Sequence, residues 1–205
     1  MGEIDEAAAG VLPRELTDLP QAVRDVPAPP TPILPAPYSI RLADADADAQ
    51  LISGWMNSPH LIEAWQYAWS TPRWRRYLGA QLSGEYSRPL IGESDGTPFV
   101  YVELYRAAKD SIARCYDADP YDVGLHAAIG DERFIHRGIA PILLPRLIDS
   151  IFTVESRCRR IMFDPDHRNA DARAICEVVG SMFLGEHDMA NRRMALYALP
   201  RDPAS

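Results

Sequence analysis

The chain has 205 residues, 47% of them apolar and 9% aromatic, which fits one soluble domain with a sizeable core rather than a disordered chain. Its formal net charge of −8 disfavours nucleic-acid binding, because a protein that follows a phosphate backbone needs a basic surface. No stretch approaches the ~20 apolar residues of a transmembrane helix, and no basic, apolar leader opens the sequence. We therefore expect a cytoplasmic protein without a transmembrane segment.

Cysteine and histidine usage argues against disulfides and structural metals. Cys115, Cys158 and Cys176 are widely spaced and odd in number, which fits neither a disulfide framework nor a zinc pattern. The five histidines show no paired ligand spacing either. The sequence therefore predicts a protein without a metal site.

Residues 1–37 differ in composition from the rest of the chain. Eight prolines fall in this segment, and the stretch PAPPTPILPAP is expected to run extended. At most one short helix is expected, around Arg14–Arg24. We interpret residues 1–37 as a Pro-rich N-terminal arm, either wrapped around the domain or loose, and residues 38–205 as the folded domain.

From Tyr38 onwards, strand and helix patterns follow one another. Thr71-Pro72 is typical of a helix start with Thr as the cap, Asp95-Gly96 is a strong hairpin signal, and Pro145 is expected to kink a helix. The order of elements predicts an α/β fold with a mixed sheet and helices packed on it. We expect strands at 38–42, 88–93, 98–105, 122–130, 160–163, 181–187 and 192–199, and helices at 44–57, 71–84, 140–152 and 169–179.

Two short basic segments stand out against the acidic background. They are residues 73–76, with the sequence RWRR, and residues 157–160, with the sequence RCRR. Each is either a solvated surface or a contact for an anionic partner, such as a carrier protein or the phosphates of coenzyme A.

The stretch at 124–152 joins a predicted strand to a predicted helix. Its turn, Arg137-Gly138-Ile139-Ala140, opens the helix, and the exposed amides of a helix start bind anions well. The same pattern also occurs in ordinary α/β architecture, so the two interpretations stay open.

A second stretch follows the predicted strand at 160–163. Pro165 prevents that strand from continuing, so Asp164 lies at its tip, where functional groups of open α/β sheets collect. The alternative is that Asp164 only shapes a turn. Asn169 is well placed to cap the next helix.

Together these stretches resemble the GNAT superfamily of acyltransferases. Residues 137–140, R-G-I-A, match the second half of the family's pyrophosphate loop, with Ile135 where Gln or Arg is usual. Residues 169–183 match the pattern N-x-x-A…E-x-x-G-x-x-F, and Cys176 stands where many members carry a tyrosine. Longer phrases, among them YDADPYDVGLHAAIGD and RRIMFDPDHRN, resemble the siderophore branch, which includes enzymes that acylate a lysine side chain in mycobactin assembly.

The resemblance implies a GNAT fold, with a central mixed twisted sheet and helices on both faces, and it implies a set of site residues. Asp164 would be the general base, and His126 would bind and orient the acceptor. The resemblance implies that the donor is acyl-CoA or an acyl-phosphopantetheine, with no metal, and that the partners are an acyl carrier protein and a lysine-containing siderophore or its precursor. The donor would contact Ala127, Ala128, Ile129, Arg137, Gly138, Ile139, Ala140 and Asn169.

The chemistry sets a condition on this site. A lysine amine has a pKa of ~10.4 and must lose a proton to attack a thioester, although N-hydroxylation would soften that demand. A carboxylate with a pKa of ~3.9 is a poor base unless burial raises it. Four aromatic residues, Trp65, Tyr67, Trp69 and Trp74, either line an acyl channel or belong to the core.

Two other functions stay open from the sequence. The first is an N-acetyltransferase for aminoglycosides or small amines. The second is a non-catalytic module that binds an acyl thioester.

Overall fold

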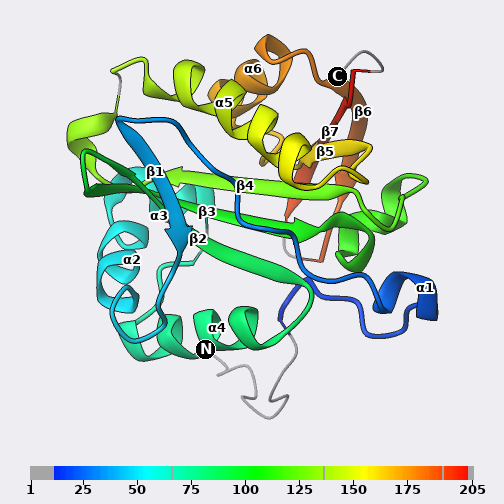
Figure 1. Ribbon diagram of the computed structural model, residues 1–205, viewed down its shortest axis with the longest axis horizontal. Helices are drawn as coiled ribbons and strands as arrows, with labels where there is room; N and C mark the ends of the chain where they lie inside the picture. The colour runs from blue at the N-terminus through cyan, green and yellow to red at the C-terminus, as the bar shows by residue number, and fades with distance from the viewer. Residues whose placement is uncertain (1–11, 66, 136, 191, 203–205) are drawn as a thin grey trace.

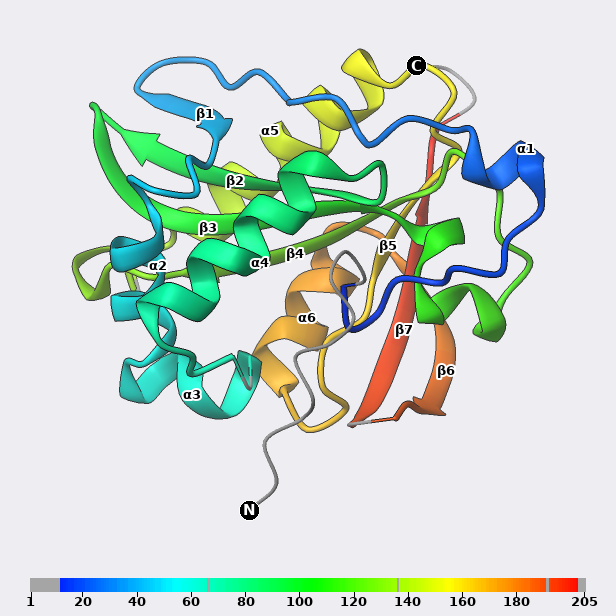
Figure 2. The same ribbon diagram turned by 90° about the horizontal axis from the view of Figure 1, so that it is seen from below.

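The computed structural model describes residues 12–65, 67–135, 137–190 and 192–202, and it is built around one seven-stranded sheet (Figure 1). The strand order is β1-β2-β3-β4-β5-β7-β6. The strands β5 to β7 run steeply across the direction of β2 to β4, so the sheet is strongly twisted (Figure 2). The strands are β1 (Tyr38–Leu42), β2 (Ser87–Ser94), β3 (Thr97–Arg106), β4 (Val123–Ile129), β5 (Arg160–Phe163), β6 (Met182–Asp188) and β7 (Arg193–Pro200).

Helices cover both faces of the sheet, as the α/β prediction requires. The helices α2 and α4 pack on one face through a cluster that contains Trp74, and α5 and α6 pack on the other through a cluster that contains Leu147 and Cys176. The helices are α1 (Gln21–Arg24), α2 (Ala49–Met56), α3 (Pro59–Trp65), α4 (Thr71–Ser83), α5 (Ile139–Val154) and α6 (Ala170–Val178), with 3-10 helices at Ala107–Lys109, Ser111–Cys115 and Glu132–Phe134.

The pairing of β4 with β5 is the feature that creates a site. β4 and β5 run parallel, whereas the other described strand pairs of the sheet are antiparallel. Only Val123 with Ile161 and Gly124 with Met162 are in register, after which the two strands diverge. Residues that follow Gly124 on β4 therefore face a gap in the sheet rather than a neighbouring strand.

Most predicted elements are confirmed within one or two residues. The hairpin turn is confirmed by positive φ angles at Asp95 (47°) and Gly96 (74°). The capping prediction for α4 is wrong, because Ser70 holds the cap position without a side-chain hydrogen bond and Thr71 is already helical. The helix α3 was not predicted, because a proline after a helix usually marks its end. Pro59 instead lies in the first turn of a new helix, where proline is also favoured. In the described part of the arm, residues 12–37, only Gln21–Arg24 is helical.

Two buried cations fasten the described part of the arm to the domain. Arg106 is fully buried, donates to the carbonyl of Pro27 at 2.6 Å, and pairs with Glu155. Lys109 is 4% exposed, and its Nζ donates to three backbone carbonyls, two of them in the arm. Those acceptors belong to Arg24, Val26 and Glu85, at 2.9, 2.6 and 3.0 Å.

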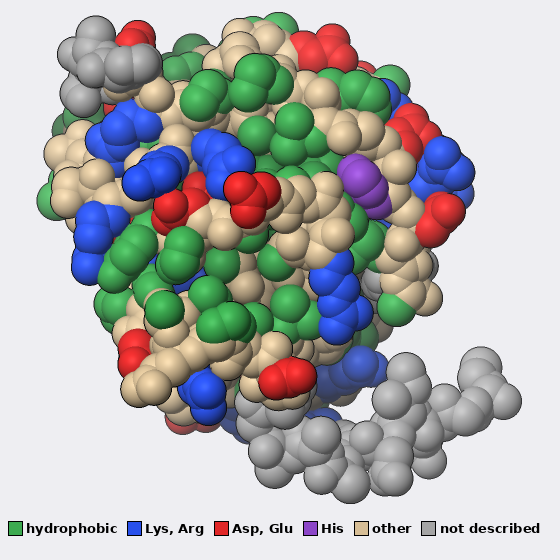
Figure 3. Space-filling model, turned by 90° about the vertical axis from the view of Figure 1, so that its right-hand side faces the viewer, with side chains coloured by type: hydrophobic (Ala, Val, Ile, Leu, Met, Phe, Trp, Pro, Cys, Tyr) green, Lys and Arg blue, Asp and Glu red, His purple; other side chains and the backbone are tan. Residues whose placement is uncertain are grey.

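The basic segment at 157–160 is neutralised within the chain. Arg157 pairs with Glu155, Arg159 with Asp119 and Arg160 with Asp122. On the face shown in Figure 3, basic and acidic side chains likewise lie beside one another, with hydrophobic ones between them. These pairs favour the interpretation as a solvated surface. No helix among the described residues is long and apolar enough to cross a membrane.

We expect the substitution Lys109→Met to lower the free energy of unfolding by about 3 kcal/mol, because buried carbonyls lose their donor. Urea denaturation would measure this. The control is Arg24→Ala, which removes an exposed guanidinium bonded to the Leu19 carbonyl and should change stability by less than ~0.5 kcal/mol. A Lys109→Met protein as stable as the wild type would contradict the fastening role.

Candidate active site

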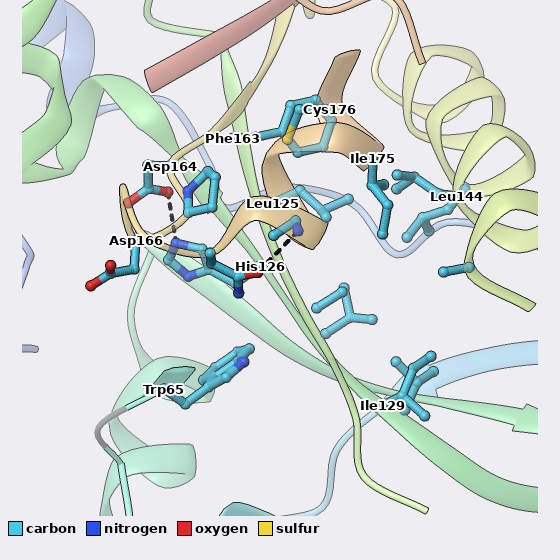
Figure 4. A pocket seen from close by; sticks show the side chains of 18 of the residues that line it. Trp65, Leu125, His126, Ile129, Leu144, Phe163, Asp164, Asp166, Ile175 and Cys176 are labelled. Atoms are coloured by element: carbon cyan, nitrogen blue, oxygen red, sulfur yellow. Dashed lines mark hydrogen bonds and ion pairs between the residues drawn. The ribbon is translucent and has the colours of Figure 1, made fainter. Parts of the chain in front are cut away.

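The cleft between the diverging strands has one polar and one apolar end. Its volume is about 320 Å³. The polar end holds Arg14, His126, Asp164 and Arg192. Figure 4 shows His126, on β4, and Asp164, directly after β5, pointing toward each other. The apolar end is lined by side chains of β3, β4, α5 and α6, among them Val102, Leu125, Leu143, Leu144, Leu147, Ile175 and Cys176.

The carboxylate of Asp164 is held by two groups through its Oδ1 atom. It is 2% exposed, it lies 2.8 Å from His126 Nε2, and it accepts a hydrogen bond from the Tyr105 hydroxyl at 2.7 Å. The Tyr105 ring reaches Asp164 by lying across Gly124, the residue with which Tyr105 is paired in the β3–β4 register. A Cβ atom at Gly124 would lie 2.0 Å from the tyrosine ring, so only glycine leaves that path open.

The second oxygen of Asp164 is held by two arginines. Arg14, from the arm, donates to Oδ2 at 2.7 Å, and Arg192 donates to the same atom at 2.5 Å. Both guanidinium groups are less than one-fifth exposed. The Asp164 carboxylate is therefore a buried anion with four donors around it.

These charges decide the pKa of Asp164. Burial pushes that pKa up, but the positive charges of Arg14, His126 and Arg192 outweigh burial and hold it well below its usual range. The sequence interpretation of Asp164 as general base required the opposite direction. That condition is not met. Met162 and Phe163 are apolar neighbours of Asp164 in the sequence, but the positive charges around the carboxylate outweigh the effect of burial on its pKa.

The neighbouring imidazole has the opposite shift. Burial lowers the pKa of His126, but the negative charge of Asp164 and hydrogen bonds to Asp164 and Glu103 raise it overall above 6.5. His126 Nδ1 lies 3.4 Å from Glu103 Oε2. The site thus keeps Asp164 ionised and gives His126 the more basic lone pair.

Glu103 orients this imidazole from the far side. It is 4% exposed and accepts hydrogen bonds from the Tyr101 hydroxyl at 2.8 Å and Gln81 Nε2 at 3.2 Å. Glu103 is not among the site residues predicted from the sequence. A lone carboxylate inside the apolar strand PFVYVELY was the available signal, because a buried charge needs a partner.

The predicted donor contacts gather at the other side of the cleft. Five of them, Ala127, Ile129, Ile139, Ala140 and Asn169, line it. Ala128 alternates to the opposite face and packs on the α2–α4 cluster, so only its backbone is available to a donor. Asn169 caps α6, as predicted, by accepting from the Ala172 amide at 3.0 Å.

The start of α5 leaves its first amides available. Gly138 occupies the cap position with a φ of 68°, which favours glycine, and offers no side-chain cap. Arg137 and Gly138 are exposed beside the cleft rather than lining it. The helix continues through Pro145 to Val154. This geometry suits an anion at the helix start.

The four aromatic residues at positions 65, 67, 69 and 74 were expected either to line an acyl channel or to belong to the core, and the structure divides them between these two places. Trp65 and Tyr67 line the cleft, and Trp65 contacts the His126 ring edge-on at 5.9 Å. Trp74 is fully buried in the core, and Trp69 stacks on Tyr67 and lies tilted against Trp74. Two of the four therefore belong to the site.

The cysteines of the chain give no indication of an activated thiol. All three cysteines are free, and burial raises the pKa of Cys176, which lines the cleft, to about 12. In the described part of the chain, no group of three or more His, Cys, Asp or Glu side chains is arranged to hold a metal ion.

Comparisons with known proteins agree with this architecture. The family model of the acetyltransferase (GNAT) domain matches residues 44–189. The chain is 67% identical over 204 residues to lysine N-acyltransferase MbtK of Mycobacterium sp. (strain MCS), covering 100% of this chain and 84% of that protein. It is 57% identical over 198 residues to lysine N-acyltransferase MbtK of Mycobacterium tuberculosis (strain ATCC 25618 / H37Rv), covering 97% of this chain and 93% of that protein.

A solved structure shares the fold at lower identity. It is an aminoglycoside acetyltransferase, AAC(6')-Ib, in complex with coenzyme A. The TM-score is 0.71 at 21% identity, over 80% of this chain and 95% of that one. This likeness shows a common fold.

We expect the His126 imidazole to titrate above pH 6.5, and the substitution Asp164→Asn to lower that midpoint because the stabilising anion is lost. NMR titration of the ring protons would measure both. Because the pKa is higher in the folded chain than in the unfolded one, His126 contributes stability that is fully present below the unfolded pKa. That contribution is lost as the pH rises through the folded pKa.

The control for this titration is Asp149→Asn, which removes an exposed carboxylate on α5 and should leave the midpoint in place. A midpoint that Asp164→Asn leaves unchanged would show that the two side chains do not share a charge.

Proposed function

This chain belongs to the GNAT acyltransferase family, and we propose that it transfers a medium- to long-chain fatty acyl group to the ε-amine of a lysine or N-hydroxylysine in siderophore biosynthesis. The lysine N-acyltransferases MbtK, which match the chain along nearly its whole length at 57–67% identity, support this activity. The observation that carries the proposal in the structure is the His126–Asp164 pair at the polar mouth of an otherwise apolar cleft.

The pair fits the proton transfer that the reaction needs. The lysine ammonium first loses one proton to solvent. As the neutral amine then attacks the thioester carbonyl, the carbon–nitrogen bond forms and His126 Nε2 takes the second proton of that nitrogen. Asp164 stays ionised and stabilises the imidazolium, with Glu103 on its other nitrogen. The carbon–sulfur bond then breaks, and the imidazolium returns the proton to the departing thiolate. In this scheme Asp164 acts through His126 rather than as the base itself.

Two further features beside the cleft, the start of α5 and the backbone of β4, suit a pantetheine thioester. The uncapped amides at the start of α5 would hold the donor's diphosphate, and the backbone of β4 beside the gap would stabilise the oxyanion. The donor is an acyl thioester of coenzyme A or of the phosphopantetheine of an acyl carrier protein. We propose the carrier protein as a partner and the cytoplasm as the location.

The apolar end favours a fatty acyl chain over acetyl. It is formed by leucines of α5 together with Leu125 and Ile175. These apolar side chains suit the burial of a hydrocarbon chain. The similarity to an aminoglycoside acetyltransferase concerns the fold alone. A purely binding module would not need the buried Asp164–His126–Glu103 array, whose ionised groups are costly to bury.

We expect the purified protein, given a mixed panel of acyl-CoA and acyl-carrier donors and of amine acceptors, to form a long-chain N-acyl-lysine product. Mass spectrometry of the products would identify donor and acceptor at once. Preference for acetyl groups and aminoglycosides would overturn the proposal, and donor binding without turnover would favour the binding module.

We expect Asp164→Asn and His126→Gln each to lower kcat by about 10²–10⁴-fold, because each removes half of the proton-transfer pair. Donor binding, measured by calorimetry with a coenzyme A thioester, should be largely kept. In the wild type, kcat/KM for the amine should fall as the pH drops through the raised pKa of His126, because the imidazolium cannot accept a proton. Wild-type rates in both variants would show that the roles are assigned wrongly, whereas the control Asp149→Asn should be fully active.

A further inference from the structure

The arm brings a cation into the acceptor end of the cleft. Arg14 lies 150 residues before Asp164 in the chain, yet its guanidinium contacts both members of the catalytic pair. Nη2 donates to Asp164 Oδ2 at 2.7 Å, and Nη1 lies 3.0 Å from His126 Nε2. Any amine that is to pass its proton to His126 must reach this same place.

One nitrogen of Arg14 is shared by two buried carboxylates. Besides Asp164, Nη2 donates to Asp110 Oδ1 at 2.9 Å, and the Asp110 side chain is fully buried. Asp110 is fixed by Tyr86 and by the Ile112 amide. The position of Nη2 is therefore a site for one cationic nitrogen between two fixed anions, and an ammonium nitrogen there would meet the same oxygens.

The contacts at His126 Nε2 exclude each other chemically. Arg14 has donors and no acceptor, so its contact with Nε2 is a hydrogen bond only when that nitrogen carries no proton. The contact with ionised Asp164 requires the reverse, a proton on Nε2. Arg14 thus covers the lone pair that the reaction uses, and it competes with the state in which Nε2 binds Asp164.

We propose that Arg14 occupies the ammonium subsite of the acceptor, formed by Asp110, Asp164 and His126, and that the acceptor's cation displaces it during each turnover. This inference rests on the proposed function, because it takes the acceptor to be a lysine-type amine. Without Arg14, the buried Asp110 carboxylate would lose its cation and Asp164 would keep Arg192 alone, which is strongly unfavourable, so the subsite stays closed by Arg14 until another cation replaces it. The proposal thereby gives Asp110 a role in recognising the acceptor's ammonium group.

The surroundings allow the side chain to move while the backbone stays. The arm beside it is held by hydrogen bonds from the Leu16 amide to the Lys109 carbonyl and from the Ser111 amide to the Arg14 carbonyl, at 2.8 and 3.0 Å. The guanidinium itself borders the open cleft. Arg192 remains on Asp164 Oδ2 after the exchange, so that the carboxylate keeps one cation throughout.

The substitution Arg14→Ala tests the exchange through the split between KM and kcat. Arg14 also lowers the pKa of His126, so the rates are compared at a pH well above that pKa. There, removing the internal competitor should lower KM for lysine about fivefold or more, a larger change than any in kcat. Methylguanidinium should then compete with lysine in the variant far better than in the wild type. The control Arg24→Ala, another arm cation, should change neither constant. A fall in kcat with KM unchanged would overturn the inference, since Arg14 would then be a positioning residue of the active complex.

A second variant, Arg14→Lys, keeps the cation and places an amine in the proposed subsite. Incubation with the acyl donor alone should add one acyl group per chain at position 14, located by peptide mass spectrometry. The background is low, because Lys109 is the single lysine of the chain and is buried. No modification at position 14, in a variant that still acylates free lysine, would overturn the inference. If instead the wild type fails to acylate free lysine while position 14 is modified, the subsite stands and the proposed acceptor is wrong.

Discussion

The site depends on one buried anion, the carboxylate of Asp164. A charge with 2% exposure is tolerated only when donors surround it, and here four side chains supply them from β3, β4, the arm and the residue before β7. Much of the local architecture follows from that need. Gly124 has no side chain because Tyr105 must cross it, and the arm is fastened so that Arg14 arrives at the right place.

The cleft itself follows from two strands that pair and then separate. While β4 and β5 stay in register, their residues belong to the core, and beyond Gly124 and Met162 they face a gap. The gap exposes polar groups at the strand tips on one side and leucines of α5 on the other. One change in strand direction therefore provides a place for proton transfer beside a place for an apolar chain.

The sequence predicted the parts whose causes are local. The Asp95-Gly96 turn and the Asn169 cap depend on neighbouring residues, and both are present as predicted. Family resemblance placed His126 and Asp164 in one site, which periodicity alone does not do. Glu103 was missed because its partner lies on the next strand, 23 residues away.

The direction of the Asp164 pKa could not be read from its neighbours. Met162 and Phe163 favour a raised value, but the charges that lower it come from Arg14 and Arg192, which are distant in sequence. The composition of the arm predicts an extended segment, yet not where that segment docks. Long-range placement of a few cations thus decides which member of the pair holds the proton.

The central claim is that Asp164 works through His126, and a double-variant cycle on the acylation rate tests it most directly. If the two side chains act as one unit, Asp164→Asn combined with His126→Gln will be no slower than the slower single variant. Losses that multiply in the double variant would mean that the carboxylate and the imidazole contribute independently, and that would contradict the account.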